Sequence, residues 1–84
     1  MTSPFATHRD KVLGGYGAAF FLQSIVLAMY NGKGFATGLS GLTNLDEDHL
    51  EAFLEMTKAY SRNGENDPEF HRLANDCLGR REEN

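Results

Sequence analysis

The stretch from Val12 to Leu45 contains a single charged residue, Lys33, in a chain of 84 residues. A segment that is neutral over such a length has to be buried in a fold, buried between copies of the chain, or placed in a membrane. A chain of this size has room for only one small core. The neutral stretch therefore limits the possible folds more than any other feature does.

Glycines interrupt this neutral stretch near its start. Gly14, Gly15 and Gly17 fall within four positions, and each costs roughly 0.8–1 kcal/mol relative to alanine inside a helix. We expect a break there, which leaves an apolar helix over about 16–30. That helix is shorter than the roughly 20 residues needed to span a bilayer, and it carries Gln23 near its middle. A membrane span is therefore the less favoured interpretation, and we expect no membrane partner.

The choice of apolar residues favours helices over strands. The chain has ten leucines and eight alanines but only three β-branched aliphatic residues. We predict an all-α fold, a small bundle of three to four helices forming one domain over residues 1–84. The expected helices span 4–13, 16–30, 46–62 and 67–78, with a glycine-rich loop over 31–45 and a frayed tail at 80–84.

Capping residues and helical spacing predict where helices end and which faces they bury. Ser3 and Asp46 are expected N-caps, and Asn63 with Gly64 is an expected C-terminal cap. The predicted buried stripe of helix 46–62 consists of Leu50, Phe53, Leu54, Thr57 and Tyr60. The predicted stripe of helix 67–78, which should end at Gly79, consists of Phe70, Leu73, Ala74, Cys77 and Leu78.

The helix over 16–30 is apolar on almost every side, so it needs cover all round. Either a second copy of the chain covers it, or the other helices of the same chain do. We favour a homo-oligomer, a dimer or larger, because small residues along this helix permit close approach. The candidate self-association residues are Gly17, Phe20, Phe21, Ser24, Leu27 and Ala28.

Acidic residues cluster at the start of helix 46–62. The net charge of −4 argues against binding to nucleic acid or to an anionic membrane. Three glutamates recur at intervals of four along one helical edge, which is either an ordinary solvated face or a surface that docks on a basic protein. The candidate partner-binding residues are Glu47, Asp48, Glu51 and Glu55.

The glycine-rich loop contains the lone cation Lys33 and invites comparison with phosphate-binding loops. Such loops require Ser or Thr directly after the lysine, whereas Gly34 follows here. The glycines either end the preceding helix and let the loop fold over the core, or they help to bind a small anion. The candidate ligand residues are Tyr30, Asn31, Gly32, Lys33 and Phe35.

No motif supports catalysis. Cys77 lies on an apolar stripe, where a thiol packs as a small hydrophobe. The three histidines lack zinc-ligand spacing, and the acids around Asp46 lack the glycine of a calcium loop. We therefore expect no enzyme activity, no metal and no cofactor. A single cysteine favours a reducing compartment, and so a cytoplasmic location.

The residues Tyr30-Asn31-Gly32 with Phe35, followed by Leu45-Asp46, carry a resemblance. The segment is similar to a family of short uncharacterised proteins encoded on bacterial plasmids and integrative conjugative elements. The resemblance covers less than half of the chain and implies an accessory protein of mobile DNA, with no established activity to transfer.

Together these features predict a small non-catalytic protein–protein interaction module. On a mobile element, it would be an accessory or anti-defence protein that binds a host or element-encoded protein. The alternative is an oligomeric protein that binds a small ligand or nucleotide through its glycine-rich loop.

Overall fold

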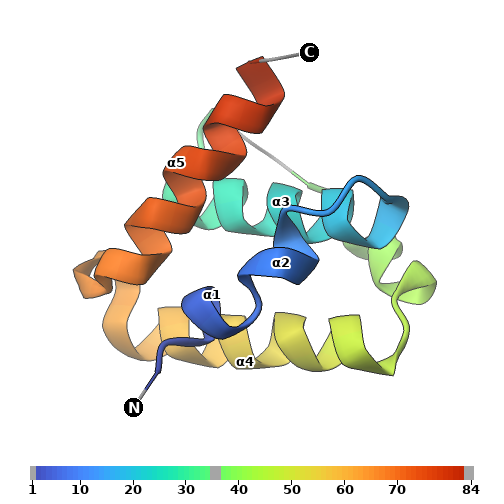
Figure 1. The fold of residues 1–84 in the computed structure, drawn as a ribbon, viewed down its shortest axis with the longest axis horizontal. Helices are drawn as coiled ribbons and strands as arrows, with labels where there is room; N and C mark the ends of the chain where they lie inside the picture. Colours follow the sequence, from blue (N-terminus) through green and yellow to red (C-terminus); the bar gives the residue numbers. More distant parts are fainter. Residues whose placement is uncertain (1, 35–36, 83–84) are drawn as a thin grey trace.

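The computed structural model describes residues 2–34 and 37–82, and every regular element in these ranges is a helix (Figure 1). The all-α prediction is confirmed. The α-helices are α1 (Pro4–Thr7), α2 (Arg9–Val12), α3 (Gly17–Tyr30), α4 (Glu47–Asn63) and α5 (Pro68–Glu82). Two short 3-10 helices are η1 (Leu39–Asn44) and η2 (Gly64–Asn66).

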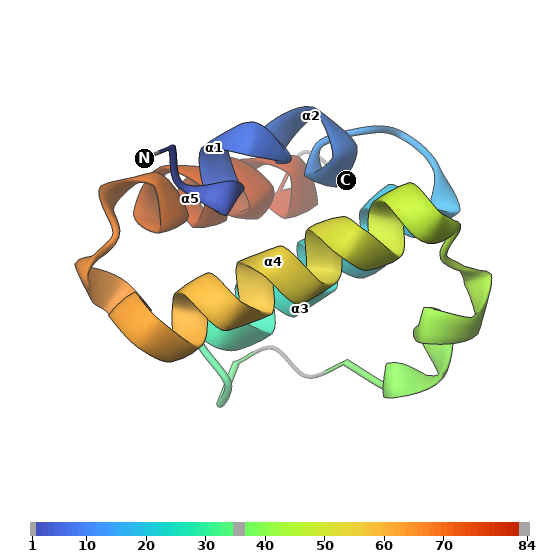
Figure 2. The same ribbon diagram turned by 90° about the horizontal axis from the view of Figure 1, so that it is seen from below.

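Helices α3 and α4 lie side by side and run in the same direction (Figures 1 and 2). Phe21 packs against Phe53 near their first turns, and the Tyr60 hydroxyl donates to the Met29 carbonyl oxygen at 2.8 Å near their last. Parallel neighbours need a connection that returns along their length, which is why a long loop containing η1 precedes α4. Helices α1 and α2 lie along α5 (Figure 2).

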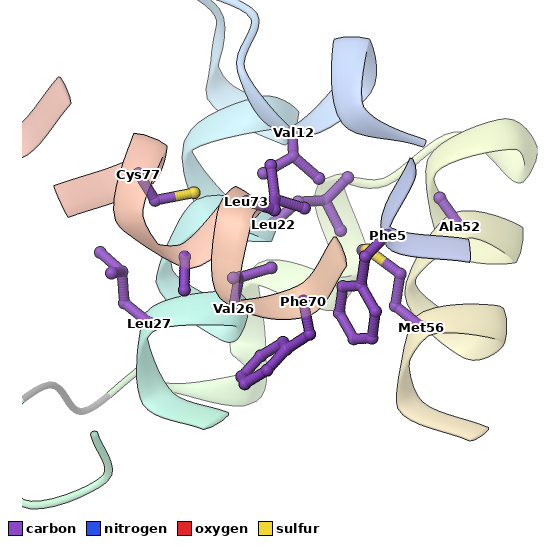
Figure 3. Close-up of a cluster of buried hydrophobic side chains, with 11 residues drawn as sticks. Phe5, Val12, Leu22, Val26, Leu27, Ala52, Met56, Phe70, Leu73 and Cys77 are labelled. Atoms are coloured by element: carbon purple, nitrogen blue, oxygen red, sulfur yellow. The ribbon is translucent and has the colours of Figure 1, made fainter. Parts of the chain in front are cut away.

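The hydrophobic core collects side chains from all five α-helices (Figure 3). Phe5 and Phe70 meet edge to face with ring centroids 5.0 Å apart, a favourable aromatic geometry. The fully buried members also include Val12, Leu22, Val26, Leu27, Ala52, Met56, Leu73, Ala74 and Cys77. The predicted stripe of the last helix is therefore confirmed, with Leu78 packed at its edge.

The predicted helix over 4–13 is two short helices instead of one. The break falls at His8, whose imidazole is turned inward and whose Nε2 lies 2.6 Å from Oε1 of Glu55 on α4. The break thus coincides with a contact to a distant helix, which local sequence preference could not have revealed.

The last helix does not end at Gly79 as expected. Helix α5 continues to Glu82, so the tail is helical over 80–82, and residues 83–84 lie outside the described part. The expected C-terminal cap at Gly64 is present, since Gly64 has φ +53° in the left-handed region that glycine tolerates best.

Both predicted N-caps are present. The Ser3 hydroxyl accepts from the Phe5 N–H at 3.2 Å, and a carboxylate oxygen of Asp46 accepts from the His49 N–H at 2.8 Å. None of the helices in the described part combines the length and the apolarity that crossing a bilayer requires.

Candidate functional site

The buried side of α4 differs from the predicted stripe. Its buried residues are His49, Ala52 and Met56. Leu50 and Leu54 are instead 39% and 50% exposed. The prediction was wrong in the rotation of the helix, and two large apolar side chains that it placed in the core face solvent.

The other members of the predicted stripe lie at or outside the boundary of the core. Phe53 is half-buried against Phe21, with ring centroids 6.2 Å apart, and Tyr60 is half-buried beneath α3. Thr57 is exposed and donates its hydroxyl hydrogen bond back to the Phe53 carbonyl oxygen. The side of α4 that packs against the rest of the chain thus has Phe53 at its edge. Leu50 and Leu54 lie on the opposite, exposed side of the helix.

A hydrogen-bond network explains how a histidine replaces a leucine on the buried side of α4. Nδ1 of His49 lies 2.7 Å from a carboxylate oxygen of Asp46, and Nε2 lies 2.8 Å from the Tyr16 hydroxyl. Since a carboxylate can only accept, the ring donates from Nδ1 to Asp46, and the remaining nitrogen, Nε2, shares a hydrogen bond with the Tyr16 hydroxyl. Both ring nitrogens have a hydrogen-bond partner, so burying the imidazole leaves neither nitrogen unpaired.

The same network alters the acidity of Asp46. The His49 backbone N–H and the His49 ring both donate to its carboxylate and hold the pKa of Asp46 below its ordinary value. The network also ties the glycine-rich linker around Tyr16 to the start of α4. The sequence signal for it is the position of His49, three residues after a capping aspartate, from which a side chain reaches back to the cap.

We call the surface formed by Leu50, Leu54, Glu47 and Glu51 the outer face of α4. Both glutamates are exposed. Glu47 lies three residues before Leu50, and Glu51 three residues before Leu54, so each carboxylate neighbours one leucine on the helix surface. The result is an exposed apolar pair with an acidic rim.

The structure gives different roles to the four acidic residues predicted to bind a partner. Asp48 is exposed in the first turn of α4. Glu55 instead bonds His8, which lies between α1 and α2, and the Glu55 side chain is 44% exposed. Nδ1 of His8 is buried and has no hydrogen-bond partner in the described part of the chain. Glu55 therefore supports the packing of α1 and leaves Glu47 and Glu51 as the carboxylates beside the exposed leucines.

The predicted loop site is dispersed. Tyr30 packs its ring against Phe70 at 6.4 Å, at the edge of the core. Asn31 closes a local turn, in which its side-chain oxygen accepts from the Gly34 N–H at 3.0 Å. Gly32 and Lys33 are exposed, and Phe35 lies outside the described residues.

The predicted self-association residues differ in how far they are exposed. Leu27 is fully buried in the core of its own chain, so it cannot contact a second copy. Phe21 is half-buried between Phe53 and Gly41, Ser24 bonds the Thr37 hydroxyl at 2.9 Å, and Ala28 is half-buried. Gly17 is exposed and Phe20 is 50% exposed. The chain itself supplies most of the cover for α3, which was the alternative interpretation.

Over residues 2–34 and 37–82, no group of three His, Cys, Asp or Glu side chains is placed to hold a metal ion. The similarity to proteins of plasmids and integrative conjugative elements stays a prediction. No protein-family model matches the chain, and no curated protein or solved structure matches it significantly.

Proposed function

We propose that this protein is a non-catalytic protein–protein interaction module whose outer face of α4 binds a basic amphipathic helix of a partner protein. One observation carries the proposal: Leu50 and Leu54 are exposed one helical turn apart, while the buried side of the helix is complete without them. The helix therefore keeps a second apolar surface that its own fold does not use.

The expected contribution of this surface is moderate. Full burial of a leucine side chain contributes about 1.5–3 kcal/mol, so completing the burial of two half-exposed leucines contributes roughly 1 kcal/mol each. Two anchors of this kind form the centre of a small interface, in which an amphipathic helix presents apolar residues at helical spacing.

The rim selects the charge of the partner. Glu47 and Glu51 border the leucines, and neither forms an ion pair with a described residue. Carboxylates in this position favour lysine or arginine at the edge of the partner and repel acidic segments. If the resemblance to proteins of mobile elements holds, the partner is a cytoplasmic host protein or one encoded by the element.

The test is a fluorescence anisotropy titration with a labelled helical peptide of leucine and lysine. We expect saturable binding that the double variant Leu50→Gln/Leu54→Gln weakens about tenfold or more. Leu39→Gln is the matched control, because Leu39 is 61% exposed but lies on η1. Equal weakening by both changes, or none by either, would refute the proposal.

A second candidate function is self-association through the exposed end of α3. Phe20 is half-exposed on the first turns of this helix, next to the exposed Gly17. Size-exclusion chromatography with light scattering tests it: Phe20→Glu should convert a dimer into a monomer. A wild-type protein that is monomeric at every accessible concentration would remove this candidate.

A further inference from the structure

A groove of about 670 Å³ lies between the N-terminal segment and the second half of α4. One wall is formed by Thr2, Ser3, Pro4 and Thr7, and the other by Glu55, Lys58, Ala59, Arg62 and Asn63, with Asp67 at the end. Its volume falls within the range of about 300–1,000 Å³ that is typical of small-molecule sites. None of the sequence-predicted loop residues lines it.

The carboxylates of the groove have hydrogen-bond partners, whereas its cations form no ion pair over residues 2–34 and 37–82. Of its two carboxylates, Glu55 bonds the imidazole of His8 at 2.6 Å, and Asp67 accepts from the Ser3 hydroxyl at 2.6 Å and from the Glu69 N–H at 3.0 Å. Lys58 and Arg62, one helical turn apart, form no ion pair with any described residue. The groove thus presents two cations that no carboxylate in the described part of the chain pairs with directly.

The surface between these groups is partly apolar. Pro4 and Ala59 contribute apolar surface on opposite walls. An occupant that satisfies both features carries an anionic head near Lys58 and Arg62 and an apolar body along the groove. Arginine favours a planar carboxylate in particular, because its guanidinium can donate two parallel hydrogen bonds to it.

We infer that this groove binds a small organic monocarboxylate with an apolar body, held by Arg62 and Lys58. A monoanion fits better than a phosphate dianion, because Glu55 and Asp67 line the same groove and repel a second negative charge. This site is independent of the outer face of α4, since none of the four residues of that face lines the groove.

The experiment is an NMR titration of the complete chain with sodium octanoate, with octanol as the uncharged analogue and octyl phosphate as the dianionic one. Saturable shifts of amides near the groove are expected with octanoate, and weaker ones with octanol. The double variant Lys58→Gln/Arg62→Gln should weaken octanoate binding about tenfold or more. Lys33→Gln, which neutralises an exposed lysine of the loop, should leave it unchanged.

Three results would overturn the inference: no saturable binding of octanoate, equal binding of octanol, or equal binding by the Lys58→Gln/Arg62→Gln and wild-type chains. Tighter binding of octyl phosphate than of octanoate would overturn the assignment to a monocarboxylate. Thermal melting of each variant establishes that it is folded, so that lost binding reports on the groove.

Discussion

The ring of Phe53 lies against that of Phe21 with centroids 6.2 Å apart, and this contact helps to fix which side of α4 faces solvent. With Phe53 at the boundary, Met56 points into the core, and Leu54 points out. Rotating α4 to bury Leu54 would expose Met56 and separate His49 from the Tyr16 hydroxyl. The exposed leucine pair is thus a consequence of how α3 and α4 pack.

The rotation of α4 predicts unequal effects of substitutions at two positions that are two residues apart and lie on opposite sides of the helix. Met56→Ala removes a fully buried side chain and should lower the free energy of unfolding by about 2–5 kcal/mol. Leu54→Gln alters a half-exposed position and should change it by about 0.5 kcal/mol or less. Urea denaturation measures both values, and equal losses would contradict the observed rotation.

The packing of the long loop on α3 predicts a difference between two glycines. A Cβ atom at Gly41 would lie 2.4 Å from the ring of Phe21, whereas at Gly38 its nearest neighbour would be the Ser40 hydroxyl at 3.9 Å. We expect Gly41→Ala to destabilise the protein by about 1–3 kcal/mol because the ring must move. Gly38→Ala, the matched control, should be close to neutral in thermal denaturation. A neutral Gly41→Ala would show that η1 does not rest on Phe21.

Features fixed by local chemistry could be predicted from the sequence. The caps at Ser3 and Asp46, the glycine break before α3 and the buried stripe of α5 all depend on residues a few positions apart. Each has a physical reason that operates within one turn of helix. For these features, the sequence prediction and the structure agree.

Features fixed by contacts between distant segments could not be predicted. Hydrophobicity ranks Leu50 above His49 for burial. Asp46 satisfies one ring nitrogen of His49, but the other depends on the Tyr16 hydroxyl, which comes from 33 residues away. The groove is a similar case. From the sequence, Lys58 and Arg62 look like ordinary solvated residues of a helix. Only the structure shows that the N-terminal segment lies opposite them.

The pairing of Glu55 with His8 predicts that one acidic residue of α4 contributes to stability. Glu55→Ala leaves a buried imidazole with neither nitrogen bonded to a described residue, which should cost about 1–3 kcal/mol. Glu51→Ala, one turn earlier and exposed, serves as the control and should be nearly neutral. Chemical denaturation compares them, and an equal response of the two variants would contradict a role of Glu55 in holding α1.

The depressed pKa of Asp46 predicts a contribution to stability that depends on pH. Because this pKa is lower in the folded chain than in the unfolded chain, the unfolded state binds more protons at acidic pH. The contribution is complete above the unfolded pKa and is lost as the pH falls through the folded pKa. Asp46→Asn retains a capping oxygen but cannot ionise, so its thermal stability should decline less steeply on the acid side. Identical acid profiles of the two proteins would contradict this assignment.

The most direct test of the outer face of α4 is a methyl NMR spectrum recorded during titration with the helical peptide of leucine and lysine. We predict saturable shifts of the Leu50 and Leu54 methyl resonances, with the buried Leu22 and the exposed Leu39 unaffected. Repeating the titration with a peptide in which glutamate replaces lysine should abolish the shifts, because the rim of Glu47 and Glu51 repels it. Unmoved Leu50 and Leu54 resonances, or equal shifts with the acidic peptide, would contradict the proposal that this face binds a basic partner.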